Sequence, residues 1–283
     1  MIITKIKCGL GNQMFQYALG RRLALDWKDE LKVDLSWFDN IQVGDIPREL
    51  EIDDFNIVLK EATESEIAKS SPYFFSRTVD KIRGCINRNH FYHFYPQILK
   101  KKKNIYLDGY FQSYKYFESI RHVLLAEFIL KSGYHQKVDE IKVAIESVDQ
   151  SVAMHIRRGD YATIRKGYHG LCDLSYYQKA LAMIKSHYPN ITLFIFSDDI
   201  EWAKSNLKYD SPMVFVSQPE LCPAEEMWLM SLCKHHIIAN STYSWWSAWL
   251  NQNPEKIVIA PKRWIRAADI NTEDLIPSNW LQI

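Results

Sequence analysis

The sequence lacks the features that mark secreted, zinc-binding and membrane-spanning proteins. Its five cysteines are odd in number and scattered, with no Cys-x-x-Cys pair, so neither a disulfide framework nor a zinc site is expected. No apolar run approaches the roughly 20 residues of a spanning helix. The first seven residues are too interrupted by lysine to form a signal peptide. We therefore expect a soluble cytoplasmic protein with reduced thiols.

The chain also lacks an excess of charge of either sign. Its 35 Lys and Arg nearly balance its 34 Asp and Glu, which argues against a general nucleic-acid binder. No Gly-x-x-x-x-Gly-Lys-Ser/Thr loop is present, which argues against a P-loop enzyme. The glycine pattern of dinucleotide-binding loops begins at Gly9 and Gly11, but Met14 replaces the third glycine, so an NAD oxidoreductase is poorly supported.

What the chain does contain is enough apolar sequence for a sizeable core, with strands and helices alternating in its second half. Hydrophobic residues make up 47% of the 283 positions, which suits one large or two moderate domains. Apolar runs predict strands at Val152–Ile156, Ile191–Ser197, Met213–Val216, His236–Ala239 and Ile257–Ala260. Helical spacing predicts helices at Ser175–His187, Asp199–Leu207, Ala224–Lys234 and Ser244–Leu250. This alternation indicates α/β units with a parallel sheet.

The first half opens in a similar way. Strands are expected at residues 1–8, 31–35 and 105–107, and helices from Asn12 and over about 116–130. Residues 39–104 contain no motif that we can assign. A polar stretch at 137–150 predicts the boundary between domains 1–145 and 146–283.

The most informative segment follows the strand expected at Val152–Ile156. Arg157 and Arg158 offer planar donor forks that match phosphate oxygens, and Gly159 lets the backbone approach a ligand closely. Asp160 adds a carboxylate that could act as a base or orient an arginine. A solvated charged loop is the competing interpretation, but the ends of parallel strands are where α/β sheets bind ligands.

Three further segments place polar groups at such positions. Asp198 and Asp199 end one strand and could cap the next helix, accept from a base or ribose, or bind a metal. Asn240, Ser241 and Thr242 end another, where they could cap a helix or donate to a phosphate. The Gly11-Asn12-Gln13 loop precedes a helix whose N-terminus favours an anion. The loop at residues 169–173 is a weaker candidate for substrate contact.

Three segments together resemble the α-1,2-fucosyltransferases of glycosyltransferase family 11. They are Gly9 to Ala18, His155 to Tyr161 and Asn240 to Trp246, and segments 107–112 and 196–202 are also similar. The resemblance runs nearly end to end. It implies a GT-B fold of two Rossmann-like domains with parallel sheets facing a cleft, the first mainly holding the acceptor and the second GDP-fucose.

The resemblance also implies an inverting transfer of L-fucose to the 2-hydroxyl of a terminal galactose, with no metal and no cofactor. Arg157 and Arg158 would then neutralise the leaving diphosphate, and Asp160 would be the base or the partner that positions them. The expected donor contacts are Gly11, Asn12, Gln13, His155, Arg157, Arg158, Asp198, Asp199, Asn240, Ser241 and Thr242.

The acceptor is expected to be a galactose-terminated oligosaccharide or lipid-linked glycan. A basic stretch from Arg77 to Lys103 could draw the enzyme to an anionic membrane surface, or could be an ordinary solvated patch. Two other functions stay open on the residues alone. The first is a GT-B transferase with another nucleotide sugar or fucosyl linkage, and the second is a non-catalytic nucleotide- or glycan-binding protein.

Overall fold

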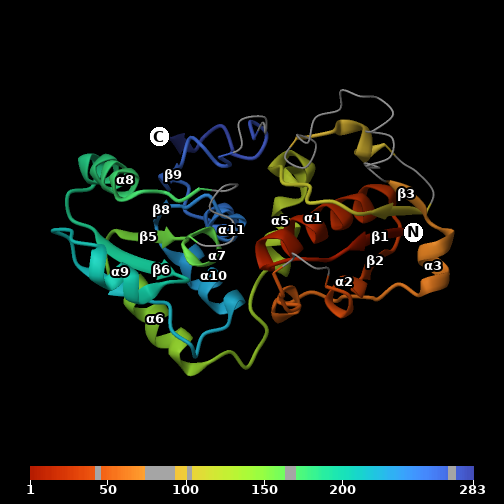
Figure 1. The fold of residues 1–283 in the computed structure, drawn as a ribbon, viewed down its shortest axis with the longest axis horizontal. Helices are drawn as coiled ribbons and strands as arrows, with labels where there is room; N and C mark the ends of the chain where they lie inside the picture. The colour runs from red at the N-terminus through yellow and green to blue at the C-terminus, as the bar shows by residue number, and fades with distance from the viewer. Residues whose placement is uncertain (42–45, 74–92, 101–103, 163–169, 267–271) are drawn as a thin grey trace. The chain divides into compact units, whose positions relative to one another are not determined.

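The chain forms two compact units. The computed structural model describes all residues except 42–45, 74–92, 101–103, 163–169 and 267–271 (Figure 1). Unit 1 comprises Met1–Ile129 with Asp269–Pro277, and unit 2 comprises Leu130–Ala268 with Ser278–Ile283. Among the described residues, no helix is both long enough and apolar enough to cross a bilayer.

Unit 1 is built on a four-stranded parallel sheet in the order β2-β1-β4-β3. Its strands are β1 (Ile2–Lys5), β2 (Leu31–Asp34), β3 (Ser71–Tyr73) and β4 (Ile105–Leu107). Its described α-helices are α1 (Leu10–Trp27), α2 (Ser36–Asp39), α3 (Glu64–Lys69) and α5 (Arg121–Glu127). Short 3-10 turns lie at Ile52–Asp54, Pro96–Leu99, Tyr114–Tyr116 and Glu118–Ile120. The helix expected over 116–130 is therefore shorter than predicted.

Helix α1 packs closely on the sheet of unit 1. A Cβ on Gly20 would lie 2.7 Å from Leu31 Cδ1 and 3.2 Å from Thr4 Cγ2, so the glycine lets the helix lie close to β1 and β2 without moving these side chains. The helix ends at Lys28, whose φ of 52° is in the left-handed region and whose N–H donates to Ala24 and Leu25 carbonyls. The opening strand, turn and helix are as predicted.

Unit 2 contains a six-stranded parallel sheet in the order β10-β9-β8-β5-β6-β7. The strands are β5 (Ser151–Ile156), β6 (Thr192–Ser197), β7 (Met213–Phe215), β8 (His235–Ile237), β9 (Val258–Ala260) and β10 (Leu281–Gln282). Counted from β5, this is the Rossmann order 3-2-1-4-5-6. The five strands predicted in this half are confirmed, and β10 was not predicted.

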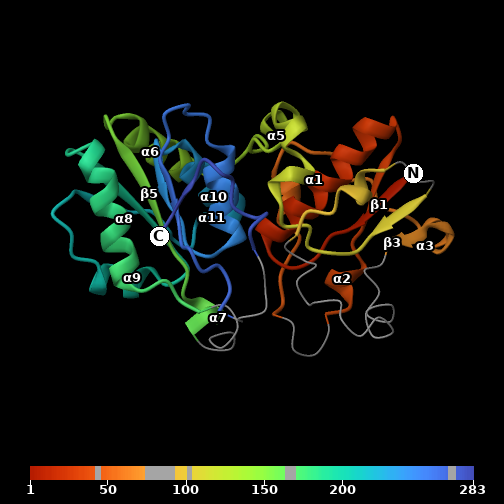
Figure 2. The same ribbon diagram turned by 90° about the horizontal axis from the view of Figure 1, so that it is seen from above.

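Helices cover both faces of this sheet (Figure 2). The described helices of unit 2 are α6 (Gln136–Glu146), α7 (Gly159–Ala162), α8 (Leu174–His187), α9 (Ile200–Asn206), α10 (Pro223–Leu232) and α11 (Thr242–Leu250), of which the short α7 lies beyond the end of β5 rather than on a face. Alternate strand residues serve the two faces. Val152 and Met154 of β5 join the core under α8 and α9, whereas Ala153 joins the core under α6 and α10.

The division into units differs from the predicted boundary of 145/146 in two places. The polar stretch 137–150 largely forms helix α6, and its Val138 and Ile145 are buried in the unit 2 core with Phe194 and Phe196. The apolar side of this helix therefore ties it to the second unit. Near the other end of the chain, Asp269–Pro277 belongs to unit 1, where Asp274 accepts a hydrogen bond of 2.9 Å from the Phe94 N–H.

Candidate active site

The sheet of unit 2 has a topological switch point between β5 and β8. From β5 the chain runs outward through β6 and β7, then returns to the other side of β5 with β8, β9 and β10. In open α/β sheets, ligands bind outside the carboxyl ends of the strands at such a point. The segments leaving β5 and β8 are the two that carry Arg157 to Asp160 and Asn240 to Thr242.

Arg157 leaves β5 beside a carboxylate from the neighbouring strand. Its Nη1 lies 3.0 Å from Oδ2 of Asp198, and its guanidinium carbon lies 5.1 Å from the centre of the Tyr161 ring. The register pairs Ile156 with Ser197, so the residues following the two strands emerge side by side. The Arg157 side chain is 19% exposed, which leaves it shielded by protein but reachable from solvent.

Arg158 is held by three groups. Its backbone N–H donates to Oδ1 of Asp198 at 2.8 Å, and its Nε lies 3.2 Å from Oδ2 of Asp199. Its guanidinium carbon stacks 3.8 Å from the centre of the Trp202 ring, which is a cation–π contact. The Asp199 carboxylate and the face of the Trp202 ring therefore set the orientation of the Arg158 guanidinium group.

The aspartates at the end of β6 position the two arginines. Asp199 is also the cap of α9, because its Oδ1 accepts from the Trp202 N–H at 3.2 Å, as the capping interpretation predicted. Asp198 spans the side chain of Arg157 and the backbone of Arg158. Asp198 and Asp199 are thus arginine-pairing carboxylates, and the two roles expected for Asp160 stay open. Among the described residues, no group of three or more His, Cys, Asp or Glu is placed to hold a metal ion.

Gly159 is required by the closeness of Asp198. A Cβ built on Gly159 would lie 2.5 Å from Oδ2 of Asp198, the oxygen that pairs with Arg157. Any side chain at this position would displace the carboxylate. The glycine predicted to allow close approach to a ligand therefore first allows close approach of the aspartate.

His155 is buried at the end of β5 and carries no charge at neutral pH. Burial, with a smaller effect from the Arg157 charge, lowers its pKa to about 3. The ring lies 5.6 Å from the Tyr243 ring, and its Nδ1 has no hydrogen-bond partner among the residues that the structure describes. Only a neutral imidazole is available here, as a hydrogen-bonding group or as packing.

The end of β8 leads into helix α11. Ser241 caps this helix, and its hydroxyl accepts from the Tyr243 N–H at 3.4 Å. Thr242 is the first helical residue. The first turn therefore presents backbone N–H groups and the positive end of the helix dipole at the switch point, which favours an anion.

Asn240 differs from the donor contact expected for it. Its Nδ2 donates to the carbonyl oxygens of Gly170 at 3.3 Å and Trp264 at 3.1 Å, and its Oδ1 accepts from Cys172 Sγ at 3.6 Å. Both of its amide protons are thus directed to protein carbonyls. The side chain joins the segment before α8 to the loop after β9, so we assign Asn240 a structural role.

Glu226 is a site residue that sequence reasoning missed. It lies on α10, and its Oε2 accepts from the Ser217 hydroxyl at 2.8 Å. Ser217 Oγ in turn accepts from the Ser197 N–H at 2.9 Å, at the end of β6. Burial, with a smaller effect from the nearby Asp198 carboxylate, raises the pKa of Glu226 to about 7. No sequence signal could have found it, because glutamate near a helix N-terminus is ordinary.

In unit 1, Gln13 also differs from its expected donor contact. Its Nε2 donates to the carbonyls of Cys8 at 2.7 Å and Glu49 at 2.8 Å, while its Oε1 accepts from the N–H groups of Glu51 and Ile52, both at 3.0 Å. The amide makes all four hydrogen bonds that it can make, and the residue is fully buried. Gln13 therefore stabilises the loop.

The N-terminus of α1 receives its anion from the protein itself. The Leu10 N–H donates to Oε2 of Glu51 at 2.8 Å, and burial raises the pKa of Glu51. Gly11 is buried in this first turn, and Asn12 accepts from Gln112 Nε2 at 2.6 Å. The anion predicted for this loop is thus a side chain of unit 1. Asn12 remains partly exposed.

Three predicted features fall outside the described residues. The backbone of Asp160 is in α7, but its side chain is not described. Most of the basic stretch from Arg77 to Lys103 is likewise outside, as is His169.

The family of the chain follows from comparison with known sequences. A family model described as Glycosyl transferase family 11 matches residues 1–283. The chain belongs to glycosyl transferase family 11. It is thus a glycosyltransferase, and the family resemblance noted in its sequence motifs is confirmed.

Two full-length relatives are bacterial. The O-antigen biosynthesis glycosyltransferase WbnK of Escherichia coli is 33% identical over 97% of this chain and 98% of that protein. An alpha-1,2-colitosyltransferase of Escherichia coli is 32% identical over 100% of this chain and 99% of that protein.

Solved structures confirm the fold class. The NodZ alpha-1,6-fucosyltransferase, in a crystal soaked with GDP-fucose, matches with a TM-score of 0.51 at 18% identity. The match covers 91% of this chain and 94% of NodZ. The family 11 chain therefore has the GT-B fold, with two Rossmann-like α/β units that each contain a parallel sheet.

Proposed function

We propose that this enzyme transfers L-fucose from GDP-fucose to the 2-hydroxyl of a terminal galactose, with inversion and without a metal ion. The observation that carries the proposal is the pair of braced arginines at the switch point, Arg157 with Asp198 and Arg158 with Asp199. The family membership and the fold shared with a fucosyltransferase support the same donor. The acceptor is a galactose-terminated oligosaccharide or lipid-linked glycan.

The two arginines stabilise the negative charge of the diphosphate as the nucleotide leaves. Breaking the bond between fucose and phosphate creates an oxocarbenium-like sugar and places negative charge on the leaving diphosphate. Fixed cations and helix N–H groups stabilise that charge without reorganisation. Arg157, Arg158 and the first turn of α11 supply these groups. Neutral His155 adds a hydrogen bond to the donor but no charge, since its pKa is about 3.

Inversion places the acceptor hydroxyl on the face of the fucose opposite to the diphosphate. A base there removes the hydroxyl proton as the new bond forms. We assign this role to Asp160, the carboxylate that follows the two arginines along the chain. Asp160→Asn should lower kcat much more than it weakens GDP binding. An equal loss of GDP affinity, measured by calorimetry, would instead make Asp160 an arginine-positioning residue.

One finding supports a second candidate donor, GDP-colitose. A full-length relative is named as an alpha-1,2-colitosyltransferase, and colitose is L-fucose without its 3-hydroxyl. A site that hydrogen-bonds that hydroxyl would reject the deoxy sugar by about 10⁴-fold or more, whereas an apolar pocket would not reject fucose strongly. Comparison of kcat/KM for GDP-fucose and GDP-colitose decides between the donors.

The test of the proposed function is direct. Purified protein is mixed with GDP-fucose and lactose in excess chelator, and the products are analysed by mass spectrometry and NMR. We expect GDP and lactose fucosylated on the galactose 2-hydroxyl. Loss of activity in chelator, restored by a divalent cation, would contradict the metal-independent reaction. Turnover with GDP-colitose but not with GDP-fucose would show that GDP-colitose is the donor.

A further inference from the structure

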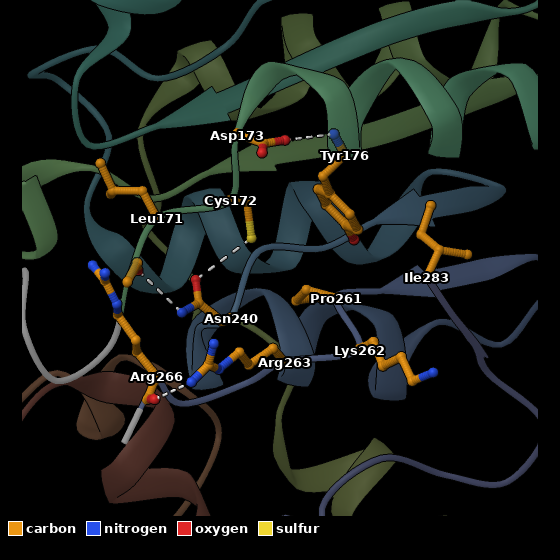
Figure 3. Close-up of a pocket in the computed structure, with 11 residues that line it drawn as sticks. Leu171, Cys172, Asp173, Tyr176, Asn240, Pro261, Lys262, Arg263, Arg266 and Ile283 are labelled. Carbon is orange, nitrogen blue, oxygen red and sulfur yellow. Dashed lines mark hydrogen bonds between the residues drawn. The ribbon is translucent and has the colours of Figure 1, made fainter. Parts of the chain in front are cut away.

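A pocket lies near the switch point in unit 2. It has a volume of about 460 Å³ at the carboxyl ends of β8 and β9 (Figure 3), within the range of small-molecule sites. Its lining comprises Gly170, Leu171, Cys172, Asp173, Tyr176, Asn240, Pro261, Lys262, Arg263, Arg266 and Ile283. We call it the β8–β9 pocket.

The walls of the β8–β9 pocket are held in place by buried hydrogen bonds. Asn240, 3% exposed, donates to Gly170 on one wall and to Trp264 on the other. The Tyr176 hydroxyl donates to the Ile238 carbonyl at 2.7 Å, and it also lies within hydrogen-bonding distance of the Ile259 carbonyl, at 3.1 Å. A network that fixes both walls keeps the pocket open without a ligand, so the site is preformed.

The rim of the pocket is cationic. Lys262, Arg263 and Arg266 line it, against a single carboxylate side chain, Asp173. Asp173 already accepts from the Tyr176 N–H at 2.9 Å and the Ser175 hydroxyl at 2.7 Å as the cap of α8. In a chain whose charges nearly balance, this is a local excess of positive charge, which attracts anions.

The three cations have no ion-pair partner in the part of the chain that the structure describes, whereas both arginines after β5 have one. Figure 3 shows Arg263 and Arg266 beside each other, and a guanidinium nitrogen of Arg263 donates to the Arg266 carbonyl. The Cβ that Gly170 lacks would lie 3.6 Å from Cβ of Arg266, and Gly170 has a φ of 74°. This turn brings the opposite wall against Arg266.

We propose that the β8–β9 pocket binds an anionic group, a carboxylate or a phosphate, carried by the acceptor saccharide. This inference rests on the proposed function. Arg157 and Arg158 follow β5. One wall of the pocket belongs to the later part of the same β5–α8 segment, and its cationic rim follows β9, two strands away. Two strand spacings are about 10 Å, the reach of a short saccharide. Apolar Leu171, Pro261 and Ile283 offer surface for a sugar ring, and the arginines bind its charge.

Matched acceptors test the proposal. Lactose, lactose 1-phosphate and galactosyl-β-1,4-glucuronic acid share a terminal galactose and differ by one anionic group. We expect the wild-type enzyme to use one of the anionic acceptors about tenfold better in kcat/KM, as one added charge-assisted contact implies. Preference for the glucuronic acid assigns the anion to an acidic sugar, and preference for the phosphate assigns it to a phosphorylated acceptor.

Variants of the rim give the decisive comparison. Arg263→Gln with Arg266→Gln should abolish the preference, leaving kcat/KM for lactose and the KM for GDP-fucose unchanged. Arg266→Lys should keep part of it. Lys208→Gln removes an exposed cation of unit 2 outside the pocket and should change nothing. Equal loss with neutral and anionic acceptors would overturn the proposal, as would the absence of any wild-type preference.

A binding measurement separates this inference from the proposed function. Lactose 1-phosphate is titrated calorimetrically into the wild-type enzyme and the double variant, with thermal unfolding as the check on folding. Binding that is about tenfold weaker in the double variant supports the pocket even if GDP-fucose proves to be the wrong donor. Equal binding to both proteins overturns the pocket even if lactose is fucosylated.

Discussion

The two arginines after β5 are oriented before any ligand arrives. Each is paired with a carboxylate, and Arg158 also stacks on Trp202. A diphosphate that binds here meets fixed guanidinium groups, so little orientational freedom is lost on binding or at the transition state. Asp198 and Asp199 contribute to the chemistry by holding the arginines.

Removal of one arginine tests this arrangement. Arg158→Ala should reduce kcat/KM by about 10²–10³-fold, because one stabilising contact to the developing charge is lost. Arg158→Lys should recover only part of the activity, because lysine lacks the planar fork. Steady-state kinetics measure both, and an unchanged melting temperature shows that folding is intact. Near-normal turnover of the alanine variant would remove Arg158 from the phosphate site.

Glu226 should make stability depend on pH. Its pKa is raised in the folded protein to about 7 from a usual 4.5, so the folded state binds the proton more tightly than the unfolded state. Protonation of Glu226 therefore stabilises the folded state fully below about pH 4.5. This stabilisation, about 3 kcal/mol in the free energy of unfolding, is lost as the pH rises towards 7.

Glu226→Gln removes this dependence. The variant should gain stability relative to the wild type between pH 4.5 and 7, in urea unfolding curves taken across that range. Glu201→Gln on α9 is a control, since Glu201 is an exposed surface residue. If the free energies of unfolding of wild type and Glu226→Gln depended on pH in the same way, the pKa of Glu226 would not be raised by folding, and the prediction would be wrong.

At the scale of elements, the two β-strand, turn and helix units that resemble nucleotide-binding loops have different uses. In unit 2, the turn after β5 exposes arginines. In unit 1, the turn after β1 is closed on its own chain by Gln13, and Glu51 occupies the N-terminus of α1. A similar order of elements thus produces one site open to a ligand anion and one helix end occupied by a carboxylate.

Substitution of Gln13 separates a structural role from a donor contact. Gln13→Ala leaves buried N–H groups at Glu51 and Ile52 without their acceptor, which should cost about 2–4 kcal/mol of stability. The GDP dissociation constant of the folded fraction should stay within about twofold of the wild type. Unfolding and titration below the melting temperature measure the two effects. A large loss of GDP affinity with normal stability would restore the donor contact.

At the scale of the whole molecule, the nucleotide should act mainly on unit 2. The switch point brings the ends of β5, β6 and β8 together there. GDP at 100 times its dissociation constant should stabilise the native protein by about 2.7 kcal/mol.

Hydrogen exchange locates this effect. Backbone amides at residues 157–159, 198–202 and 241–244 should exchange more slowly with GDP bound, and UDP at the same concentration should protect them less. Protection confined to unit 1 would contradict the proposal that GDP binds to unit 2.

The sequence by itself determined the alternating elements of unit 2, the family, and the segments that end β5, β6 and β8. These signals are local, because apolar periodicity and motif spacing depend on neighbours along the chain. Only the tertiary structure decided which polar groups meet. These meetings include the pairing of Arg157 with Asp198 and the hydrogen bonds of Gln13 to Glu51 and Ile52. They also include the burial of Glu226 and the cationic β8–β9 pocket, whose walls come from separate parts of the chain. Parallel strand register creates these contacts, since it aligns the ends of strands that the chain keeps far apart.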